Sequence, residues 1–268
     1  MVQIKANIIE KKQYGADGVL FRLIAPEIVK DAQPGQYTLI RCGDGYDPLL
    51  RRPFSFHRID KKQGAIDILF RIVGKGTTLL AEKNAGDTCD ILGPLGNGFK
   101  FDDKVNRPIL LAGGMGVAPL FALADQMVKT GLNPLVFLGA KTKEELWCAE
   151  NFKSLGCETH LATDDGSFGF KGTVLELFKS AIRPSTPFRI NNPQSAIVIY
   201  GCGPKVMLHQ LAKLALEQKF RCQISLEESM ACGLGACQGC VVSVVGPEKY
   251  KLVCKDGPVF NSSEIKWN

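Results

Sequence analysis

The segment from Ser225 to Cys254 reads SLEESMACGLGACQGCVVSVVGPEKYKLVC. Its cysteines are Cys232, Cys237, Cys240 and Cys254. The spacing C-x4-C-x2-C, with a fourth cysteine after a short hairpin, is the ligand order of a plant-type 2Fe–2S cluster. Two irons bridged by sulfides need four thiolates in one small volume, so the loop that supplies three of them must curl. Glycines between the first and third cysteines permit such a curl. The segment therefore predicts an iron–sulfur site.

A structural zinc ion is the alternative reading of the same cysteines, because four thiolates also bind zinc tetrahedrally. Zinc modules usually show two paired C-x2–4-C knuckles, whereas this segment has one. The spacing favours the cluster. A zinc-binding module on a redox-inactive scaffold stays open as the competing hypothesis.

The composition is that of a water-soluble globular protein long enough for two ordinary domains: 268 residues, 45% hydrophobic and 22% charged. The formal charge of +6 is mild, and the basic residues are scattered, so we expect no nucleic-acid binding. The N-terminus MVQIKANIIEKK has no apolar signal-peptide core. No apolar run approaches the roughly 18–20 residues that span a bilayer. We expect a cytoplasmic protein that keeps its remaining cysteines as thiols.

Short strands separated by Gly and Pro make up the first hundred residues and predict an antiparallel β-barrel. The expected strands are Val2–Lys11, Val19–Ile24, Gln36–Arg41, Pro53–Ile59, Ala65–Val73 and Thr88–Leu92, and a helix is expected over Leu79–Asn84.

Two features of this barrel are compatible with a flavin dinucleotide. The first is Arg52-Pro53-Phe54-Ser55: an arginine can pair with a pyrophosphate, an aromatic ring can lie against a flat ring, and a hydroxyl can reach a ring nitrogen. A basic strand edge with a core phenylalanine explains the same residues. The second is the glycine turn at Gly74–Thr77, where a helix N-terminus and its amides can face an anion. An ordinary capped helix is the structural alternative.

Strands and helices alternate from about residue 105 to 222, which predicts a doubly wound parallel α/β domain. The expected strands are Ile109–Ala112, Leu135–Gly139, Glu158–Thr163 and Ala196–Tyr200. The expected helices are Leu120–Lys129, Lys143–Phe152, Val174–Ser180 and Lys205–Gln218.

Ligands of such sheets bind at the carboxyl ends of the strands, where three loops predict a nicotinamide nucleotide site. Gly113, Gly114 and Gly116 let a pyrophosphate approach the backbone, although the loop lacks the G-x-G-x-x-G pattern. The turn at Thr163, Asp164 and Asp165 offers carboxylates to ribose hydroxyls and would repel a 2′-phosphate, which favours NAD(H) over NADP(H). An exposed Asp-Gly turn is the structural alternative. The third loop contributes Cys202 and Gly203.

Electron counting links these parts. NADH carries two electrons as a hydride, whereas a 2Fe–2S cluster takes one at a time. A flavin accepts two and releases one, so a nucleotide domain together with a cluster strengthens the flavin prediction. We expect NAD(H), flavin and cluster in series, with the terminal partner on another polypeptide.

The order of the motifs resembles the ferredoxin–NADP reductase superfamily over nearly the whole chain. The cysteine loop Met230–Cys240 and the ending Val253–Phe260 look more narrowly like the electron-transfer subunits of B-type dihydroorotate dehydrogenases. That resemblance implies FAD, a 2Fe–2S cluster and NAD(H). It also implies an FMN-containing catalytic partner that converts dihydroorotate to orotate in pyrimidine biosynthesis, in a heterotetramer of two chains of each kind. Electrons would then run from FMN through the cluster and FAD to NAD+.

The resemblance also implies site residues. The FAD contacts would be Arg52, Pro53, Phe54, Ser55, Leu69, Phe70, Arg71, Gly76 and Thr77. The superfamily usually has Tyr where this chain has Phe54, so a phenol hydrogen bond is lost there. The implied fold is a Greek-key FAD-binding barrel at 1–101, an NAD-binding α/β domain at 102–222 and a 2Fe–2S module at 223–268. A related reductase subunit serving ferredoxin, sulfide or hydrogenase partners remains the alternative function.

Overall fold

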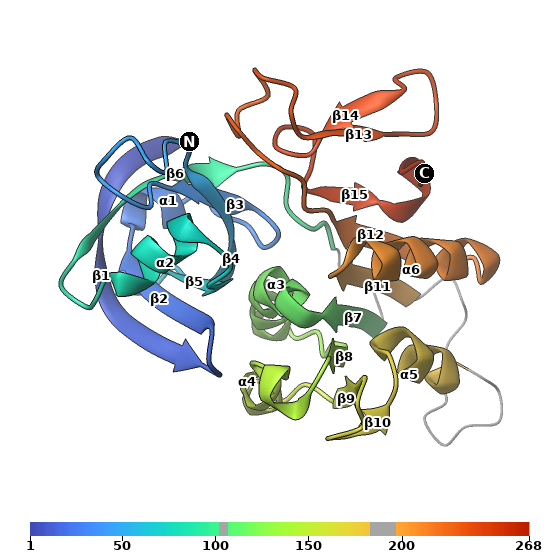
Figure 1. The fold of residues 1–268 in the computed structure, drawn as a ribbon. Coiled ribbons are helices and arrows are strands. Elements are labelled where there is room, and N and C mark those ends of the chain that lie inside the picture. Colours follow the sequence, from blue (N-terminus) through green and yellow to red (C-terminus); the bar gives the residue numbers. More distant parts are fainter. Residues whose placement is uncertain (102–106, 183–196, 268) are drawn as a thin grey trace. The chain divides into compact units, whose positions relative to one another are not determined.

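The computed structural model describes residues 1–101, 107–182 and 197–267, and the chain forms two compact units (Figure 1). The first unit joins Met1–Phe99 to Glu227–Val259, and the second joins Lys100–Leu226 to Phe260–Asn268. The boundary expected between Phe101 and Arg107 falls on residues 102–106, which lie outside the described residues. The boundary expected at residue 222 falls within a strand that runs over Arg221–Ser225. The division into three domains stays a prediction.

Six antiparallel strands close into a barrel in the first unit, which confirms the predicted architecture. They are β1 (Val2–Tyr14), β2 (Gly18–Ile24), β3 (Tyr37–Ile40), β4 (Arg52–Asp60), β5 (Ala65–Arg71) and β6 (Thr88–Leu95). Their order is β1-β2-β5-β4-β3-β6. Because β2 lies beside β5 rather than β3, the consecutive hairpins β3-β4-β5 are flanked as in a Greek key.

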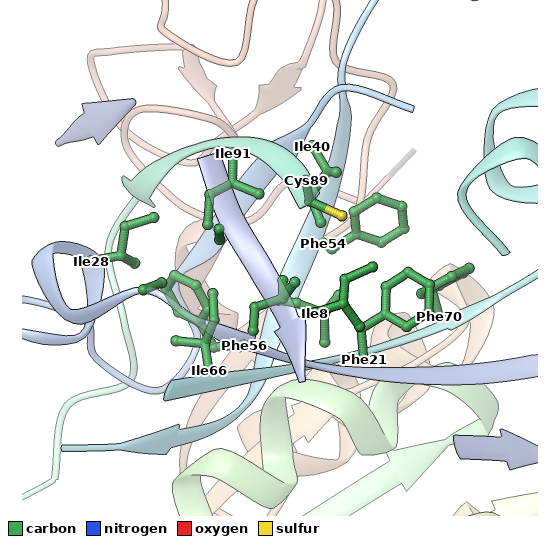
Figure 2. Packing of buried hydrophobic residues seen from close by; sticks show 14 of the residues in the cluster. Ile8, Phe21, Ile28, Ile40, Phe54, Phe56, Ile66, Phe70, Cys89 and Ile91 are labelled. Carbon is green, nitrogen blue, oxygen red and sulfur yellow. The ribbon is translucent and has the colours of Figure 1, made fainter. Parts of the chain in front are cut away.

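Aliphatic and aromatic side chains from alternate strand positions fill the barrel (Figure 2). Phe21 of β2, Phe56 of β4 and Ile66 of β5 are all fully buried there. Two short helices, α1 (Pro26–Val29) and α2 (Lys75–Glu82), add Ile28 and Leu80 to the same core. The period-two pattern of the sequence thus becomes one apolar interior.

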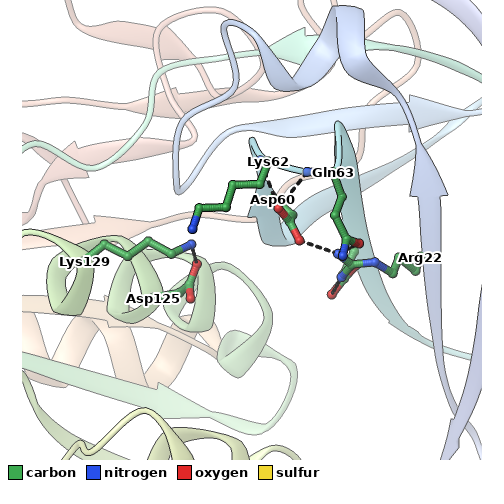
Figure 3. Close-up of polar contacts among 7 residues, drawn as sticks. Arg22, Asp60, Lys62, Gln63, Asp125 and Lys129 are labelled. Carbon is green, nitrogen blue, oxygen red and sulfur yellow. Dashed lines mark hydrogen bonds and ion pairs between the residues drawn. The ribbon is translucent and has the colours of Figure 1, made fainter.

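Arg22 forms ion pairs with carboxylates on two neighbouring strands of the barrel. Its Nη2 lies 2.6 Å from Oδ2 of Asp60, and its Nη1 lies 2.9 Å from Oδ1 of Asp67. Asp60 also accepts the backbone N–H groups of Lys62 and Gln63, each at 3.1 Å (Figure 3). The group ties β2 to β4 and β5.

The second unit is built on a seven-stranded sheet of order β10-β9-β8-β7-β11-β12-β15. Its strands are β7 (Arg107–Gly113), β8 (Leu135–Ala140), β9 (Thr159–Thr163), β10 (Phe170–Lys171), β11 (Ile197–Cys202), β12 (Arg221–Ser225) and β15 (Val259–Asn261). The pairs from β10 to β12 are parallel, as predicted. The helices are α3 (Val117–Lys129), α4 (Ala149–Ser154), α5 (Val174–Ala181) and α6 (Lys205–Glu217).

The helix predicted over Lys143–Phe152 is wrong in its first half. A 3-10 turn covers Lys143–Glu145, and α4 starts only at Ala149. Between them Cys148 has a left-handed φ of 64°, and the indole N–H of Trp147 donates back to the carbonyl of Glu144 at 3.0 Å. The helix expected to begin at Leu79 instead begins at Lys75, after Gly74.

In the parts of the chain that the structure describes, no helix combines the length and the apolar character that crossing a membrane requires.

Candidate iron–sulfur, flavin and nucleotide sites

A two-stranded hairpin brings the third and fourth cysteines of the predicted cluster site together. It consists of β13 (Val241–Ser243) and β14 (Tyr250–Leu252), with Val241 opposite Leu252. Cys240 precedes the first strand and Cys254 follows the second, so both thiols lie at the open end of the hairpin. The N–H of Cys254 donates to Sγ of Cys240 at 3.3 Å, and the N–H of Val253 donates to the Cys240 carbonyl at 3.0 Å.

The loop between the first two cysteines directs backbone N–H groups at the sulfurs. Sγ of Cys232 accepts from Leu234 and Cys237, each at 3.4 Å, and Sγ of Cys254 accepts from Gly235 at 3.1 Å. These donors hold the pKa of the Cys232 thiol down to about 6. Amide donors of this kind stabilise the anionic sulfurs of a cluster.

The remaining thiols differ in exposure. Cys237 is exposed, whereas Cys240 and Cys254 are buried. Burial, together with the neighbouring Cys240, raises the pKa of Cys254 to about 12. A thiolate at this position therefore requires a nearby positive charge, which a bound iron supplies.

The four thiols form two pairs. The N–H of Cys237 donates to Sγ of Cys232 at 3.4 Å, and the N–H of Cys254 donates to Sγ of Cys240 at 3.3 Å. Within the described ranges, no three His, Cys, Asp or Glu side chains are arranged around a single metal ion. Two thiol pairs with converging amides are the donor set that two bridged irons require, and the residues fit a 2Fe–2S cluster.

The predicted flavin residues lie on two adjacent barrel strands and one helix. Arg52, Pro53, Phe54 and Ser55 are on β4, and Leu69, Phe70 and Arg71 are on β5. The ring of Phe54 lies inside the barrel, 5.3 Å from the ring of Phe70 between centroids. Alternation along β4 turns Pro53 and Ser55 to the opposite face, where both are half-buried. Nε of Arg71 lies 3.3 Å from a carboxylate oxygen of Asp17.

Gly76 and Thr77 belong to the first turn of α2, beside Arg52. A Cβ at Gly76 would lie 3.4 Å from Nε of Arg52, so guanidinium and helix N-terminus adjoin each other. The Thr77 hydroxyl accepts the N–H groups of Val73 and Gly74 at 2.9 and 3.1 Å, which closes the turn that leads into the helix. A guanidinium next to the positive end of a helix fits a phosphate of a dinucleotide.

Two of the three predicted nucleotide loops pack against each other at the carboxyl ends of adjacent strands. Cys202 at the end of β11 pairs with Ala112 of β7. A Cβ at Gly116 would lie 2.0 Å from the carbonyl oxygen of Cys202, so only glycine permits this approach. Gly113, Gly114 and Gly203 belong to the same two loops. The Cys202 side chain is buried.

The third loop follows β9, two strands from β7 in the sheet. The hydroxyl of Thr163 donates to the carbonyl of Phe168 at 2.8 Å and accepts its N–H at 3.0 Å, so this buried side chain shapes the turn. Asp165 accepts the N–H and hydroxyl of Ser167 at 2.9 and 2.6 Å, and these bonds lower its pKa. Asp164 is exposed, and no described residue engages its carboxylate.

Tyr37 is a residue near the cluster loop that sequence reasoning missed. Its hydroxyl lies 3.0 Å from the carbonyl oxygens of both Gly233 and Cys254. A tyrosine in a barrel strand carries no sequence signal for such a contact.

Two family models match the chain. The iron–sulfur cluster binding domain of dihydroorotate dehydrogenase B matches residues 227–266, and the oxidoreductase NAD-binding domain matches residues 110–213.

Several relatives carry the name "dihydroorotate dehydrogenase B (NAD(+)), electron transfer subunit". The one from Desulforamulus reducens is 39% identical over 91% of this chain and 90% of its own length. The one from Bacillus caldolyticus is 46% identical over 87% and 86%. The one from Geobacillus sp. (strain WCH70) is 45% identical over 99% of both chains.

Solved structures agree in fold. An NADH-dependent reduced ferredoxin–NADP oxidoreductase superimposes with a TM-score of 0.84 at 30% identity, covering 98% of this chain and 90% of the other. The ferredoxin reductase of carbazole 1,9a-dioxygenase superimposes with a TM-score of 0.68 at 18% identity, covering 82% and 66%, which shows the fold alone.

Proposed function

Because this chain belongs to the family of electron transfer subunits of dihydroorotate dehydrogenase B (NAD(+)), we propose that it passes electrons from an FMN-containing catalytic subunit to NAD+. The chain is an NAD-linked flavin iron–sulfur oxidoreductase with FAD and a 2Fe–2S cluster as cofactors. The pathway served is pyrimidine biosynthesis, as the family name implies. The conversion of dihydroorotate to orotate itself belongs to the partner.

The two cysteine pairs, together with the backbone N–H groups directed at their sulfurs, carry this proposal. Cys232, Cys237, Cys240 and Cys254 are proposed as the cluster ligands, with the Gly235 and Cys254 amides as donors to sulfur. Cys240 and Cys254 are buried, whereas Cys232 and Cys237 are more exposed. One side of the cluster would therefore lie close to solvent. An electron from another subunit can enter on that side.

The flavin is proposed to bind along β4, β5 and the first turn of α2. Arg52 and the α2 amides hold the pyrophosphate, which is supported by their adjacency. The half-buried face of Pro53 and Ser55 is the side of β4 available to the ring system. When bound, FAD accepts single electrons and releases a pair as hydride, which is the conversion that a cluster and NAD+ require. The other contacts proposed are Phe54, Leu69, Phe70, Arg71, Gly76 and Thr77.

NAD+ is proposed to bind at the ends of β7, β9 and β11. The close approach of Gly116 to Cys202 brings two of the loops together at the N-terminus of α3, which suits a pyrophosphate. Asp164 is proposed to accept from the ribose hydroxyls, since its carboxylate is exposed and none of the residues that the structure describes binds it. Thr163 and Asp165 shape this turn. Gly113, Gly114, Cys202 and Gly203 complete the site.

The assembly is proposed to be a heterotetramer with two copies of each subunit, located in the cytoplasm. A catalytic partner is implied by the family name, and the partner's FMN, the stoichiometry and the compartment are proposals. Ten free cysteines suit a reducing compartment. A reductase serving ferredoxin is not favoured, because relatives at 39–46% identity share the dihydroorotate dehydrogenase name.

An absorption spectrum of the anaerobically purified chain, taken before and after NADH, tests the proposal. Flavin bands and a broad red-brown envelope that both bleach with NADH are expected. The chain alone should form no orotate, and co-expression with an FMN-containing partner should yield a complex that reduces NAD+ with dihydroorotate. A colourless, zinc-containing protein would refute the proposal, and so would orotate formation by the single chain.

A further inference from the structure

Tyr37 occupies a position between the proposed flavin strand and the cluster loop. It is the first residue of β3 and pairs directly with Ser55 of β4 on one side. On its other side β3 pairs with β6, where Tyr37 lies opposite Leu95. Only 2% of Tyr37 is exposed. A buried phenol needs a hydrogen-bond partner, and Tyr37 finds it in the cluster segment.

The hydroxyl of Tyr37 contacts the backbone on both sides of the cluster loop. It lies 3.0 Å from the carbonyl oxygen of Gly233, next to Cys232, and 3.0 Å from that of Cys254. A phenol has one proton to donate, so the two carbonyls share it. One barrel side chain thus holds the loop of the first ligand and the segment of the fourth.

The neighbouring residues of the barrel reinforce this contact. Leu39 faces the same side of β3 as Tyr37, and a Cβ at Gly233 would lie 2.6 Å from its Cδ1. Asn97 holds the segment after the fourth cysteine: its N–H donates to the Gly257 carbonyl at 2.6 Å, and its Nδ2 donates to the Asp256 carbonyl at 3.0 Å. The fourth ligand therefore sits on a preformed barrel surface.

We propose that Tyr37 is a positioning residue for the cluster, whose hydroxyl holds the Gly233 and Cys254 carbonyls so that the four thiols are set for iron before it binds. The inference rests on the proposed function, because it presumes the cluster at these cysteines. The inference goes beyond the proposed function, because it assigns to a barrel residue a role in retaining the cluster and in setting its midpoint potential.

The hydrogen bond also has an electrostatic consequence of known sign. The O–H dipole directs its positive end at the backbone of the ligand segment. A positive end near the cluster stabilises the reduced state, which carries one more negative charge. Loss of the hydroxyl should therefore make the midpoint potential of the cluster more negative and leave that of FAD unchanged.

The test compares full-length holoprotein with its Tyr37→Phe variant, which keeps the ring and removes the hydroxyl. Iron release to a chelator should be about tenfold faster in the variant, because two buried acceptors lose their donor. The cluster potential, followed by EPR during a redox titration, should shift negative. FAD content should match wild type.

Tyr200→Phe is the matched control, because Tyr200 is also fully buried and its hydroxyl contacts a backbone carbonyl, that of Lys100, at 3.4 Å. It should release iron at the wild-type rate. The proposal is overturned if Tyr37→Phe keeps the wild-type iron release and potential. It is equally overturned if the variant loses FAD along with iron, since the residue would then support the barrel rather than the cluster. A wild-type protein without a cluster would instead mark failure of the proposed function.

Discussion

The backbone N–H of Cys254 donates to Sγ of Cys240 at 3.3 Å, at the open end of the β13–β14 hairpin. The two residues are 14 positions apart, and antiparallel pairing of Val241 with Leu252 brings them together. The hairpin therefore brings Cys254, the proposed fourth ligand, next to Cys240, the proposed third. Without it, the loop would offer three thiols to two irons.

We expect Cys254→Ala to abolish cluster binding, because one of the two irons would keep a single protein thiolate. Iron analysis of anaerobically purified protein should fall from about two irons per chain to almost none, with FAD retained. Cys157→Ala is the control, since Cys157 is a buried cysteine outside the loop. A Cys254→Ala variant with full iron content would contradict the ligand assignment.

Arg52→Ala should weaken FAD binding about tenfold to hundredfold, the range for one lost charge-assisted hydrogen bond. The reason is the position of Arg52 beside the first turn of α2. The measurement is a fluorescence titration of FAD-depleted, full-length protein with FAD.

Arg51→Ala is the matched control for that titration. Arg51 is engaged within the barrel, where Nη1 donates to the Asp90 carbonyl at 2.9 Å and Nη2 to its carboxylate at 2.7 Å. Arg51→Ala should lower the melting temperature, but it should change the FAD dissociation constant less than Arg52→Ala does. Equal effects of the two substitutions on FAD affinity would refute the role of Arg52.

Asp164→Ser should raise kcat/KM for NADPH by about tenfold or more and lower that for NADH. An exposed carboxylate accepts from ribose hydroxyls and repels a 2′-phosphate. Two unit charges about 4 Å apart near a protein surface repel by up to about 4 kcal/mol, which exceeds the roughly 1.4 kcal/mol that a tenfold change requires. Steady-state kinetics with both nucleotides and an artificial acceptor measure the change. If the preference is unaltered, another residue discriminates the ribose.

Asp165→Asn separates the two neighbouring carboxylates. Asp165 accepts hydrogen bonds from the hydroxyl and N–H of Ser167, so its substitution loosens the turn. The exposed carboxylate of Asp164 is kept. We expect a similar loss of affinity for NADH and NADPH, with little change in their ratio.

The cysteine spacing and the alternation of strands and helices were sufficient to predict the iron–sulfur domain and both folds, because each depends on residues close in sequence. The contacts that position the site are not local. Tyr37 is 196 residues from Gly233 and 217 from Cys254, so the local sequence around Tyr37 does not predict the contact.

The break before α4 could not be predicted for a related reason. The segment KEELWCAENF contains several favourable helix formers and neither Gly nor Pro, so propensity alone extends the helix. The chain instead turns at Cys148, where tertiary packing buries both Trp147 and Cys148. Burial of these side chains outweighs the local preference.

Asp60 and Asp67, the two carboxylates paired with Arg22, should contribute to folding stability with opposite dependences on pH. Burial raises the pKa of Asp67 to about 6, although Arg22 and Arg58 oppose this shift. Burial also acts on Asp60, but the N–H of Gln63 and the Arg22 guanidinium outweigh it, and the pKa of Asp60 is lowered. The shared guanidinium lowers the pKa of both carboxylates, and the deeper burial of Asp67 makes the two net shifts opposite in sign.

The direction in which the stability contributed by Asp67 changes with pH follows from its raised pKa. The folded protein holds this proton more tightly than the unfolded chain, whose Asp pKa is about 3.9. The resulting stability is fully present below about pH 4 and is lost as the pH rises through about 6, a loss of up to about 3 kcal/mol. Asp67→Asn should remove this decline, whereas Asp60→Asn should remove stability that wild type loses as the pH falls. Urea unfolding of the full chain, followed by FAD release at intervals between about pH 4 and 7, measures both. Parallel pH profiles for wild type and Asp67→Asn would show that Arg22 keeps Asp67 ionised throughout this range.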